Sequence, residues 1–315
     1  MAACRILRRA PWRSGARRPS TSTHDVRSQA PTACGAGRRD RRYVHLRIGA
    51  VLSPEAEWAA VAGAAEAADR RGLDSIGLWD HYHALAPDLG YVAGWAAFGA
   101  LASKTGSVKV VPMVINVLHY ELGVLAKETS VLSHISGGRF ELGIGAGDWP
   151  ASFVAWGKPF PAAADRAAIL GDVVNGLRML WSGEPVSVTT QRMKLVDAIC
   201  APPPLETPRI VVGCGPSRSL VRLAAGWADE INVYDDDSLI ALAREEAEAS
   251  DRAIGVSVTL GWEWDKWPAD PEPHIRRLAD AGIDRVFISM MGEDNDSRIA
   301  ALADLQPSPA SAPTR

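Results

Sequence analysis

A carboxylate and an imidazole stand next to each other at Asp80-His81, directly after a short apolar stretch that predicts a buried strand. A histidine titrates near neutral pH, and a neighbouring acid can fix its tautomer, so this pair suits proton transfer. The alternative is that Asp80 caps the following loop and that His81 is solvated. Both residues are therefore candidates for a catalytic site.

A glycine-rich segment, Gly145-Ala146-Gly147, ends another predicted strand and is followed by Asp148. Glycines at the end of a strand allow the backbone to approach a flat or bulky group closely. The alternative is that they serve only a tight turn. Asp148 could be an acid of the site or the cap of the next turn.

A second glycine-rich turn, Gly213-Cys214-Gly215-Pro216-Ser217, precedes a predicted helix. Free backbone N–H groups and the positive end of the helix dipole favour a phosphate group at such a turn. A plain connection between a strand and a helix would have the same sequence features. Cys214 fits a packing residue better than a nucleophile, because no partner base is visible.

Several other kinds of site find no support in the sequence. No His, Cys, Asp or Glu cluster has metal-ligand spacing, and no Gly-x-Ser-x-Gly motif is present. The four cysteines form no Cys-x-x-Cys pair, which favours a reducing compartment without structural disulfides. No apolar run reaches the length of a membrane span. The sequence thus predicts a cytoplasmic protein without a metal site or a membrane partner.

Charge is distributed unevenly along the 315 residues, although the net charge is only −3. Residues 1–42 hold eleven arginines against Asp25 and Asp40, and removing them from the totals of 34 basic and 37 acidic residues leaves an excess of twelve acidic residues. An acidic body argues against a nucleic-acid partner. We predict a disordered Arg-rich extension at 1–42 and a disordered tail at 307–315. The composition of the extension would also fit a transit peptide.

Strand and helix patterns alternate eight times between residues 43 and 306, which predicts a single α/β domain with the (β/α)8 TIM-barrel fold; an open doubly wound sheet is the alternative. The predicted strands are 44–52, 74–79, 108–116, 139–144, 209–213, 230–234, 257–264 and 285–290. The predicted helices are 53–72, 91–103, 121–135, 162–181, 217–226, 238–250, 272–281 and 295–305. A Pro-rich passage at 183–208 predicts a short insertion between the fourth helix and the fifth strand, with edge strands at 187–189 and 193–195. In such a barrel the candidate residues gather at the carboxyl ends of the strands.

Several motifs carry a family resemblance that extends from Val44 to about Met290. They are Ala67-Ala68-Asp69-Arg70-Arg71-Gly72-Leu73-Asp74-Ser75-Ile76, Trp79-Asp80-His81, Leu125-Ala126-Lys127, Ser136-Gly137-Gly138-Arg139-Phe140, Gly143-Ile144-Gly145-Ala146-Gly147, Gly157-Lys158-Pro159-Phe160-Pro161, Leu195-Val196-Asp197-Ala198 and Leu223-Ala224-Ala225-Gly226-Trp227-Ala228-Asp229-Glu230-Ile231-Asn232. Together they resemble the luciferase-like monooxygenase family (bacterial luciferase superfamily), and most closely its coenzyme F420-dependent oxidoreductases.

The resemblance implies a flat cofactor across the carboxyl face of a TIM barrel. A bulge with a non-prolyl cis peptide would fall at Met113-Val114, against the cofactor ring, with Asn116 beside it. From the residues alone, Asn116 would be the ordinary end of a strand. The resemblance also implies that Asp80 and His81 contact the deazaflavin and that His81 takes part in proton transfer.

Two further parts of the site follow from the resemblance. Gly145-Ala146-Gly147 would form one edge, and the cofactor phosphate would meet the turn from Gly213 to Ser219. Asp148 stands where some members carry glutamate and others a neutral residue. Cys214 and Pro216 depart from the usual glycine run, although proline suits a first helical position.

Three functions are compatible with these features. The first is hydride transfer between coenzyme F420 and a small-molecule substrate, with His81 moving a proton. The second is an FMN-dependent monooxygenase that uses reduced flavin and O2, and the third is a cofactor-binding protein without turnover. The resemblance also implies a homodimer.

Overall fold

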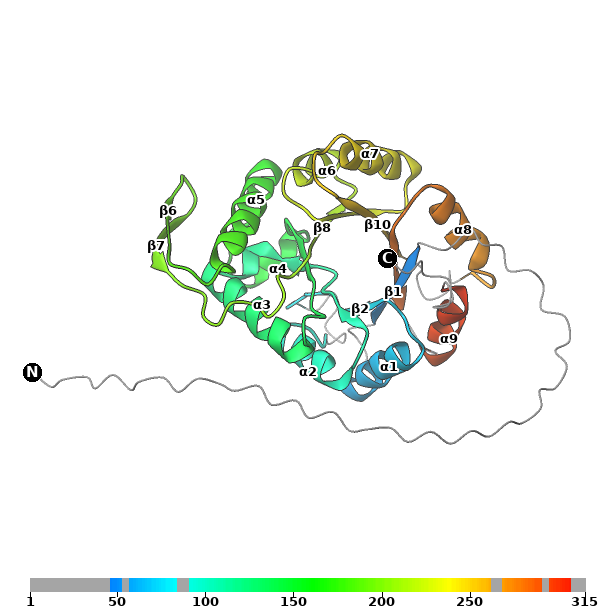
Figure 1. The fold of residues 1–315 in the computed structure, drawn as a ribbon. Coiled ribbons are helices and arrows are strands. Elements are labelled where there is room, and N and C mark those ends of the chain that lie inside the picture. Colours follow the sequence, from blue (N-terminus) through cyan, green and yellow to red (C-terminus); the bar gives the residue numbers. More distant parts are fainter. Residues whose placement is uncertain (1–45, 53–56, 84–90, 262–267, 291–294, 307–315) are drawn as a thin grey trace, which may run out of the picture. The chain divides into compact units, whose positions relative to one another are not determined.

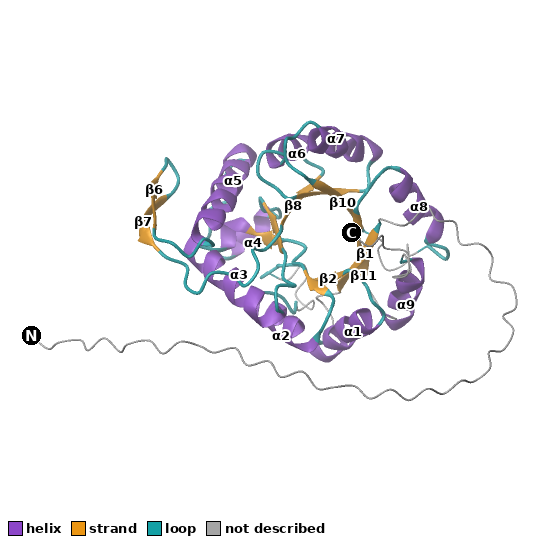
Figure 2. Ribbon diagram, viewed as in Figure 1, coloured by secondary structure: helices purple, strands orange, loops and turns teal. Residues whose placement is uncertain are grey.

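Strands lie at the centre of the structure, and helices surround them (Figures 1 and 2). The structure is a computed structural model in which residues 46–52, 57–83, 91–261, 268–290 and 295–306 are described. The predicted extension at 1–42, the predicted tail at 307–315 and the predicted helix start at Ser53-Pro54 lie outside the described residues.

The central strands are all parallel and form a sheet with the order β3-β2-β1-β11-β10-β9-β8-β5-β4. Their bounds are β1 (Arg47–Leu52), β2 (Ser75–Gly77), β3 (Lys109–Val110), β4 (Ile115–Asn116), β5 (Leu142–Gly145), β8 (Ile210–Gly215), β9 (Glu230–Tyr234), β10 (Gly255–Leu260) and β11 (Arg285–Met290).

The sheet closes into a barrel because β3 and β4 are two halves of one predicted strand, 108–116. One half pairs with β2 and the other with β5. The Val110 N–H also donates to the Arg139 carbonyl at 3.2 Å, and the Glu141 N–H donates to the Val110 carbonyl at 3.1 Å, which joins β3 to the start of β5. The predicted eight-stranded barrel is therefore confirmed, and the open sheet does not form.

Helices cover the outside of the barrel, one after nearly every strand (Figure 2). Their bounds are α1 (Trp58–Arg70), α2 (Trp95–Lys104), α3 (Leu122–Ser136), α4 (Pro150–Ala155), α5 (Ala163–Leu180), α6 (Arg218–Ala224), α7 (Asp237–Glu248), α8 (Glu272–Asp280) and α9 (Asn295–Leu305). A 3-10 turn, η2 (Val117–His119), follows β4. Two predictions were wrong: α4 was not expected, and α2 begins at Trp95 instead of Tyr91, because Gly94 before it has a φ of 85°.

The predicted insertion is a hairpin of β6 (Val186–Thr189) and β7 (Lys194–Ala198), which pair antiparallel. It lies between α5 and β8 in the sequence, as predicted, and projects beyond the ring of helices in Figure 1. It adds no strand to the barrel.

A buried ion-pair network fills the amino end of the barrel interior. The Arg285 guanidinium, whose side chain is 0% exposed, donates to the Glu230 carboxylate at 2.8 and 3.0 Å and to Glu141 at 2.7 Å. Burial alone would raise the pKa of Glu230, but Arg285, together with Arg47, holds that pKa below its ordinary value. The carboxyl end is thus the end at which this barrel can accept a ligand.

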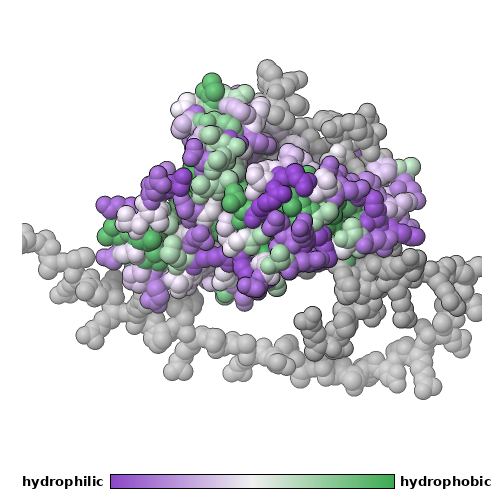
Figure 3. Space-filling model, turned by 90° about the horizontal axis from the view of Figure 1, so that it is seen from above, coloured by the Kyte–Doolittle hydropathy of each residue, from purple (hydrophilic) through white to green (hydrophobic). Residues whose placement is uncertain are grey.

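The outer surface mixes polar and apolar residues over the face that Figure 3 shows. Among the described residues, no helix has the length and apolar character needed to cross a membrane.

Candidate active site

The third strand of the barrel carries the irregularity that shapes the site. The peptide bond between Met113 and Val114 is cis, at the position that the resemblance implies. Two neighbouring strands make room for this segment with glycines: a Cβ on Gly77 would lie 2.1 Å from the Val111 carbonyl oxygen, and one on Gly143 would lie 1.7 Å from the Pro112 oxygen. No side chain fits at either position.

The Val114 side chain lies between two glycines on the next strands. A Cβ on Gly145 would lie 2.8 Å from Val114 Cγ2, and one on Gly213 would lie 2.9 Å from Val114 Cγ1. Val114 also packs against an apolar cluster in the barrel interior that contains Met113 and Phe287. The side chain closest to Gly145 is therefore part of the chain itself, and the ligand contact of this glycine stays a prediction.

His81 lies among aromatic rings. The ring centroids of Trp79, Trp149 and Tyr91 are 5.7, 5.9 and 6.0 Å from the imidazole. Burial lowers the pKa of His81 below its ordinary value, and the charge of Asp148 offsets part of that shift. The imidazole is therefore neutral at neutral pH and can accept a proton.

Asp80 is a buried carboxyl group with only 4% of its surface exposed. It accepts hydrogen bonds from the Tyr120 hydroxyl, 2.9 Å from each oxygen, and from the Asn116 N–H at 3.4 Å. Burial raises the pKa of Asp80 to about 6, although both hydrogen bonds act in the opposite direction. Asp80 thus joins the end of β2 to the end of β4, and it titrates close to neutral pH.

Asn116 is the last residue of β4 and pairs with Gly145 of β5. Its Oδ1 accepts a hydrogen bond from the Leu118 N–H at 3.1 Å and so caps η2. Gly147, with a φ of 86°, leaves room for this amide, since a Cβ there would lie 2.7 Å from Asn116 Oδ1. The segment Gly145-Ala146-Gly147 therefore contacts Val114 at one end and Asn116 at the other.

Asp148 is exposed and acts across the barrel mouth on two groups. Its charge opposes the lowering of the His81 pKa, and it adds to the effect of burial in raising the pKa of Tyr234. Tyr234, the last residue of β9, lies beside Gly215, where a Cβ would be 3.5 Å from the ring. The charge of Asp148 thus acts on one residue after β2 and on the last residue of β9.

The segment from Gly213 to Ser217 offers few polar groups to a ligand, because Pro216 has no N–H and the Ser217 N–H donates to the Cys214 carbonyl at 3.0 Å. Cys214 is buried in the main core, and burial raises the pKa of its thiol, which fits the packing role predicted for it. The Ser217 hydroxyl accepts a hydrogen bond from the Leu220 N–H at 3.3 Å and caps α6. Pro216 is exposed between them.

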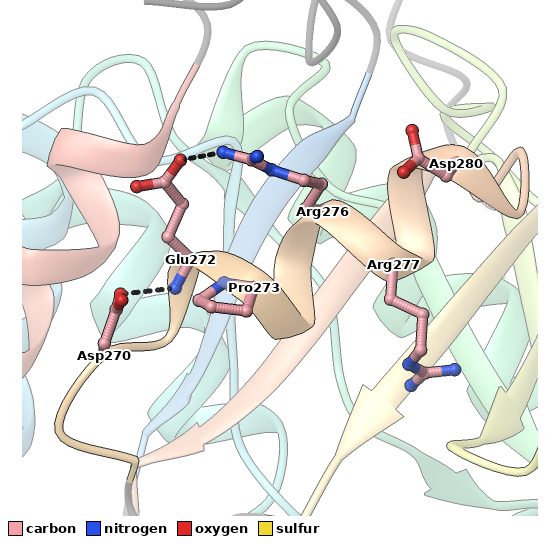
Figure 4. Close-up of a pocket in the computed structure, with 6 residues that line it drawn as sticks. All are labelled: Asp270, Glu272, Pro273, Arg276, Arg277 and Asp280. Atoms are coloured by element: carbon pink, nitrogen blue, oxygen red, sulfur yellow. Dashed lines mark hydrogen bonds and ion pairs between the residues drawn. The ribbon is translucent and has the colours of Figure 1, made fainter.

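Two surface hollows lie away from the barrel mouth. One runs along α8 and the residues before it. In it the Arg276 guanidinium donates to the Glu272 carboxylate, and the Glu272 backbone N–H donates to Asp270 (Figure 4). The other lies between α5 and α6 and contains Gly171 and Trp227. Neither includes a predicted site residue.

The family model for luciferase-like monooxygenases matches residues 43–265. The chain belongs to this family. The predicted resemblance is therefore confirmed.

Three comparisons place this luciferase-like chain among its relatives. An F420-dependent glucose-6-phosphate dehydrogenase of Kineococcus radiotolerans is 30% identical over 223 residues, which cover 66% of this chain and 65% of that enzyme. The structure of an F420-dependent secondary alcohol dehydrogenase in complex with an F420-acetone adduct superposes with a TM-score of 0.70 at 17% identity, covering 83% of this chain and 98% of the other.

The structure of the FMN complex of the oxygenating constituent of 3,6-diketocamphane monooxygenase from Pseudomonas putida superposes with a TM-score of 0.59 at 18% identity. The match covers 74% of this chain and 71% of the other. The chain spans less than two thirds of the dehydrogenase relative. The two solved structures establish the barrel fold of the luciferase-like family for this chain.

The structure brings most of the predicted residues together. Asp80 accepts a hydrogen bond from the Asn116 N–H, the charge of Asp148 acts on His81, and Val114 lies between Gly145 and Gly213. The Cys214 side chain lies in the core, and the Ser217 hydroxyl caps α6.

Tyr120 and Tyr234 were missed. Tyr234 ends a predicted strand and would have been found by taking the last residue of every strand, whereas no sequence signal marks Tyr120 as the partner of Asp80.

Proposed function

We propose that the chain is an oxidoreductase that passes a hydride between coenzyme F420 and a small organic substrate at the carboxyl face of the barrel. The observation that carries the proposal is the environment of His81, a neutral imidazole between aromatic rings at that face. The F420-dependent relatives support the choice of cofactor.

The residues at the mouth fit a flat aromatic cofactor. Trp79, which flanks His81, packs against the apolar cluster that contains Met113 and Val114, so an apolar wall and an imidazole lie on connected surfaces. Pro216 has no N–H and the Ser217 N–H donates to the Cys214 carbonyl at 3.0 Å, so the cofactor phosphate would meet the first residues of α6, Arg218 and Ser219. When bound, coenzyme F420 would supply the carbon that accepts or donates the hydride.

Each side chain at the site would then have its own role in the reaction. His81 accepts the proton of a substrate hydroxyl as a hydride leaves the adjacent carbon, or returns it in the reverse direction. Asp148 stabilises the imidazolium that results, because its negative charge raises the pKa of His81. The hydrogen bond from the Asn116 N–H to Asp80 joins the end of β4 to the segment after β2, on which His81 lies.

The test of this function is the variant His81→Asn. We expect it to bind F420 about as tightly as the wild type and to lose about 10²- to 10⁴-fold in turnover, the usual contribution of a general base. The matched control is His134→Asn, an exposed histidine of α3 that contacts the Pro203 carbonyl, which we expect to keep full activity. Equal turnover in the two variants would refute the proposed role of His81.

We also propose that the chain forms a homodimer through the outer face of α3. Val124, Val131 and Ile135 lie on one side of this helix and are 47%, 36% and 46% exposed. A second copy of the chain would cover them. Light scattering of the purified protein should give twice the mass of one chain.

A further inference from the structure

A buried hydroxyl group near the end of β11 has no hydrogen-bond partner among the described residues. It belongs to Ser289, which is 5% exposed and stands one residue before the end of the strand. An unpaired buried hydroxyl is costly, because it has lost its hydrogen bonds to water without replacement. Native structures keep few such groups, so each of them indicates a function or a bound partner.

The alternation of side chains along β11 directs Ser289 into the barrel. Arg285 belongs to the buried ion-pair network of the interior, and Phe287 belongs to the interior apolar cluster that contains Met113. Alternate residues of a strand share a face, so Ser289 faces the interior one step closer to the carboxyl end than Phe287. It therefore lies in the layer of interior side chains that borders the carboxyl face, where barrel enzymes bind their ligands.

The polar interior side chains of the two preceding strands are already paired with one another. Thr259 Oγ1 donates to Asn232 Oδ1 at 2.9 Å, and Asn232 Nδ2 donates to Ser257 Oγ at 3.0 Å. These side chains belong to β9 and β10, and none of their hydrogen bonds goes to Ser289.

An apolar row begins beside Ser289 on the other side. Ser289 pairs with Val51 of β1, and Val51 pairs with Gly77 of β2. A Cβ on Gly77 would lie 3.1 Å from Met113 Cγ, so the Met113 side chain lies over this glycine. Val51 and Met113 both belong to the apolar cluster against which Val114 packs. The row thus leads from one unpaired hydroxyl across apolar side chains to the cis peptide bond.

We propose that the Ser289 hydroxyl donates a hydrogen bond to a carbonyl oxygen on the pyrimidinedione edge of the cofactor ring, the edge that deazaflavins and flavins share. A flat ring system against Val51 and Met113 needs no polar contact along its face, but this edge carries two carbonyl oxygens. Neighbouring strands lie about 4.8 Å apart, so the row from Ser289 to Gly77 spans about 10 Å, which is comparable to the length of three fused rings. One end of the ring system can therefore lie near Met113 while the other meets Ser289.

The surroundings of Ser289 favour this edge over the opposite end of the F420 ring. The opposite end carries an acidic hydroxyl, and its anion needs water or a cation. Ser289 provides neither, because it is buried, uncharged and paired with Val51. The pyrimidinedione edge is neutral, and a serine hydroxyl is a suitable donor to its carbonyl groups. This inference rests on the proposed function for the choice of F420, and it goes further by assigning a residue to one edge of the ring.

The first experiment compares the F420 affinity of Ser289→Ala with that of the wild type by spectral titration. Loss of one hydrogen bond between uncharged groups should weaken binding by about 2- to 10-fold. The matched control is Ser75→Ala, since Ser75 is a second interior serine whose hydroxyl lacks a partner among the described residues. Ser75 pairs with Gly49, one step closer to the amino end than the pair of Val51 and Gly77, so this variant should keep wild-type affinity. Equal affinity in the two variants would overturn the proposal.

The second experiment measures unfolding by denaturant without cofactor. Ser289→Ala removes an unpaired buried hydroxyl, so its unfolding midpoint should equal or exceed that of the wild type. A lower midpoint would show that the hydroxyl already has a partner inside the protein, and it would overturn the proposal.

The third experiment identifies the edge by an infrared difference spectrum of bound F420. A hydrogen bond lowers the stretching frequency of a carbonyl group, so one ring carbonyl band should move to higher frequency in Ser289→Ala and stay unchanged in Ser75→Ala. Unchanged carbonyl bands in Ser289→Ala would show that its hydroxyl does not meet this edge.

Titrations with FMN, which has the same pyrimidinedione edge, separate this proposal from the proposed function. If the wild type binds FMN and not F420, the proposed function fails, and weaker FMN binding by Ser289→Ala still supports the role of Ser289. If Ser289→Ala binds F420 with wild-type affinity, the role of Ser289 fails and the proposed function stands. Failure of the wild type to bind either cofactor would contradict both.

Discussion

Val114 fills the space beside Gly145, where a Cβ atom would lie 2.8 Å from Val114 Cγ2. Gly145→Ala should therefore displace Val114, which is also held from the other side by Gly213. Overpacking of this kind costs about 1–3 kcal/mol of unfolding free energy. Because Val114 belongs to the proposed cofactor wall, F420 affinity should fall as well. Denaturant unfolding and an F420 titration measure the two effects.

Gly63→Ala is the matched control, because a Cβ on Gly63 in α1 meets nothing within 4 Å. This change should raise the unfolding free energy by about 0.5–1 kcal/mol, as alanine favours a helix over glycine. If Gly145→Ala proved as harmless as Gly63→Ala, Val114 would not have the tight position described above.

The sequence patterns predicted the repeating part of the fold well. Residues 230–234, 285–290 and 295–305 were predicted with the bounds that β9, β11 and α9 have, because buried parallel strands read as short apolar runs between helical patterns. The third strand was predicted as continuous at 108–116 but is split into β3 and β4 around the cis peptide. Periodicity gives no sign of such a break.

The sequence identified several residues of the site, but it did not predict the contacts between them. Asp80, His81 and Asp148 could be chosen because they follow strands, and the barrel then brings the ends of those strands together. The bond between Tyr120 and Asp80 joins residues forty positions apart, and it depends on the path of the segment after β4. The sequence also gives no sign that Val114 and Asn116 lie in the spaces beside Gly145 and Gly147.

Asp80 should make stability depend on pH. Its pKa is raised from 3.8 to about 6 in the folded chain, so it contributes stability below pH 4 that is lost as the pH rises through 6. Asp80→Asn does not titrate. The unfolding free energy of the wild type relative to this variant should therefore fall by about 2 kcal/mol between pH 4.5 and pH 7.5. Chemical denaturation across this range measures it, and a constant difference would show that Asp80 is not buried as described.

Asp148→Asn should shift the pH dependence of the reaction. Removing this carboxylate takes away the charge that raises the pKa of His81, so that pKa should fall further. If neutral His81 is the base, the acid limb of kcat/KM should move to lower pH, and histidine NMR of the cofactor-free protein should show the same shift. Asp165→Asn on α5 is the control, since this exposed residue pairs with Arg192. If the acid limb of kcat/KM stayed at the same pH in Asp148→Asn, the charge of Asp148 would not affect the pKa of His81.

Arg285→Met should destabilise the barrel strongly. The change leaves Glu230 and Glu141 buried without their main cationic partner, and loss of one partner of a buried ion pair costs about 3–5 kcal/mol. Arg222→Met is the control, because Arg222 is 54% exposed and its pair with Glu246 should contribute less than about 1 kcal/mol. A neutral or stabilising Arg285→Met would show that the network is replaceable by apolar packing.

The cofactor decides between hydride transfer and oxygen chemistry, so the most direct measurement is a spectral titration of the purified protein with coenzyme F420 and, separately, with FMN. The account predicts saturable binding of F420 and a dissociation constant for FMN at least about tenfold larger. Tight binding of FMN without affinity for F420 would contradict it.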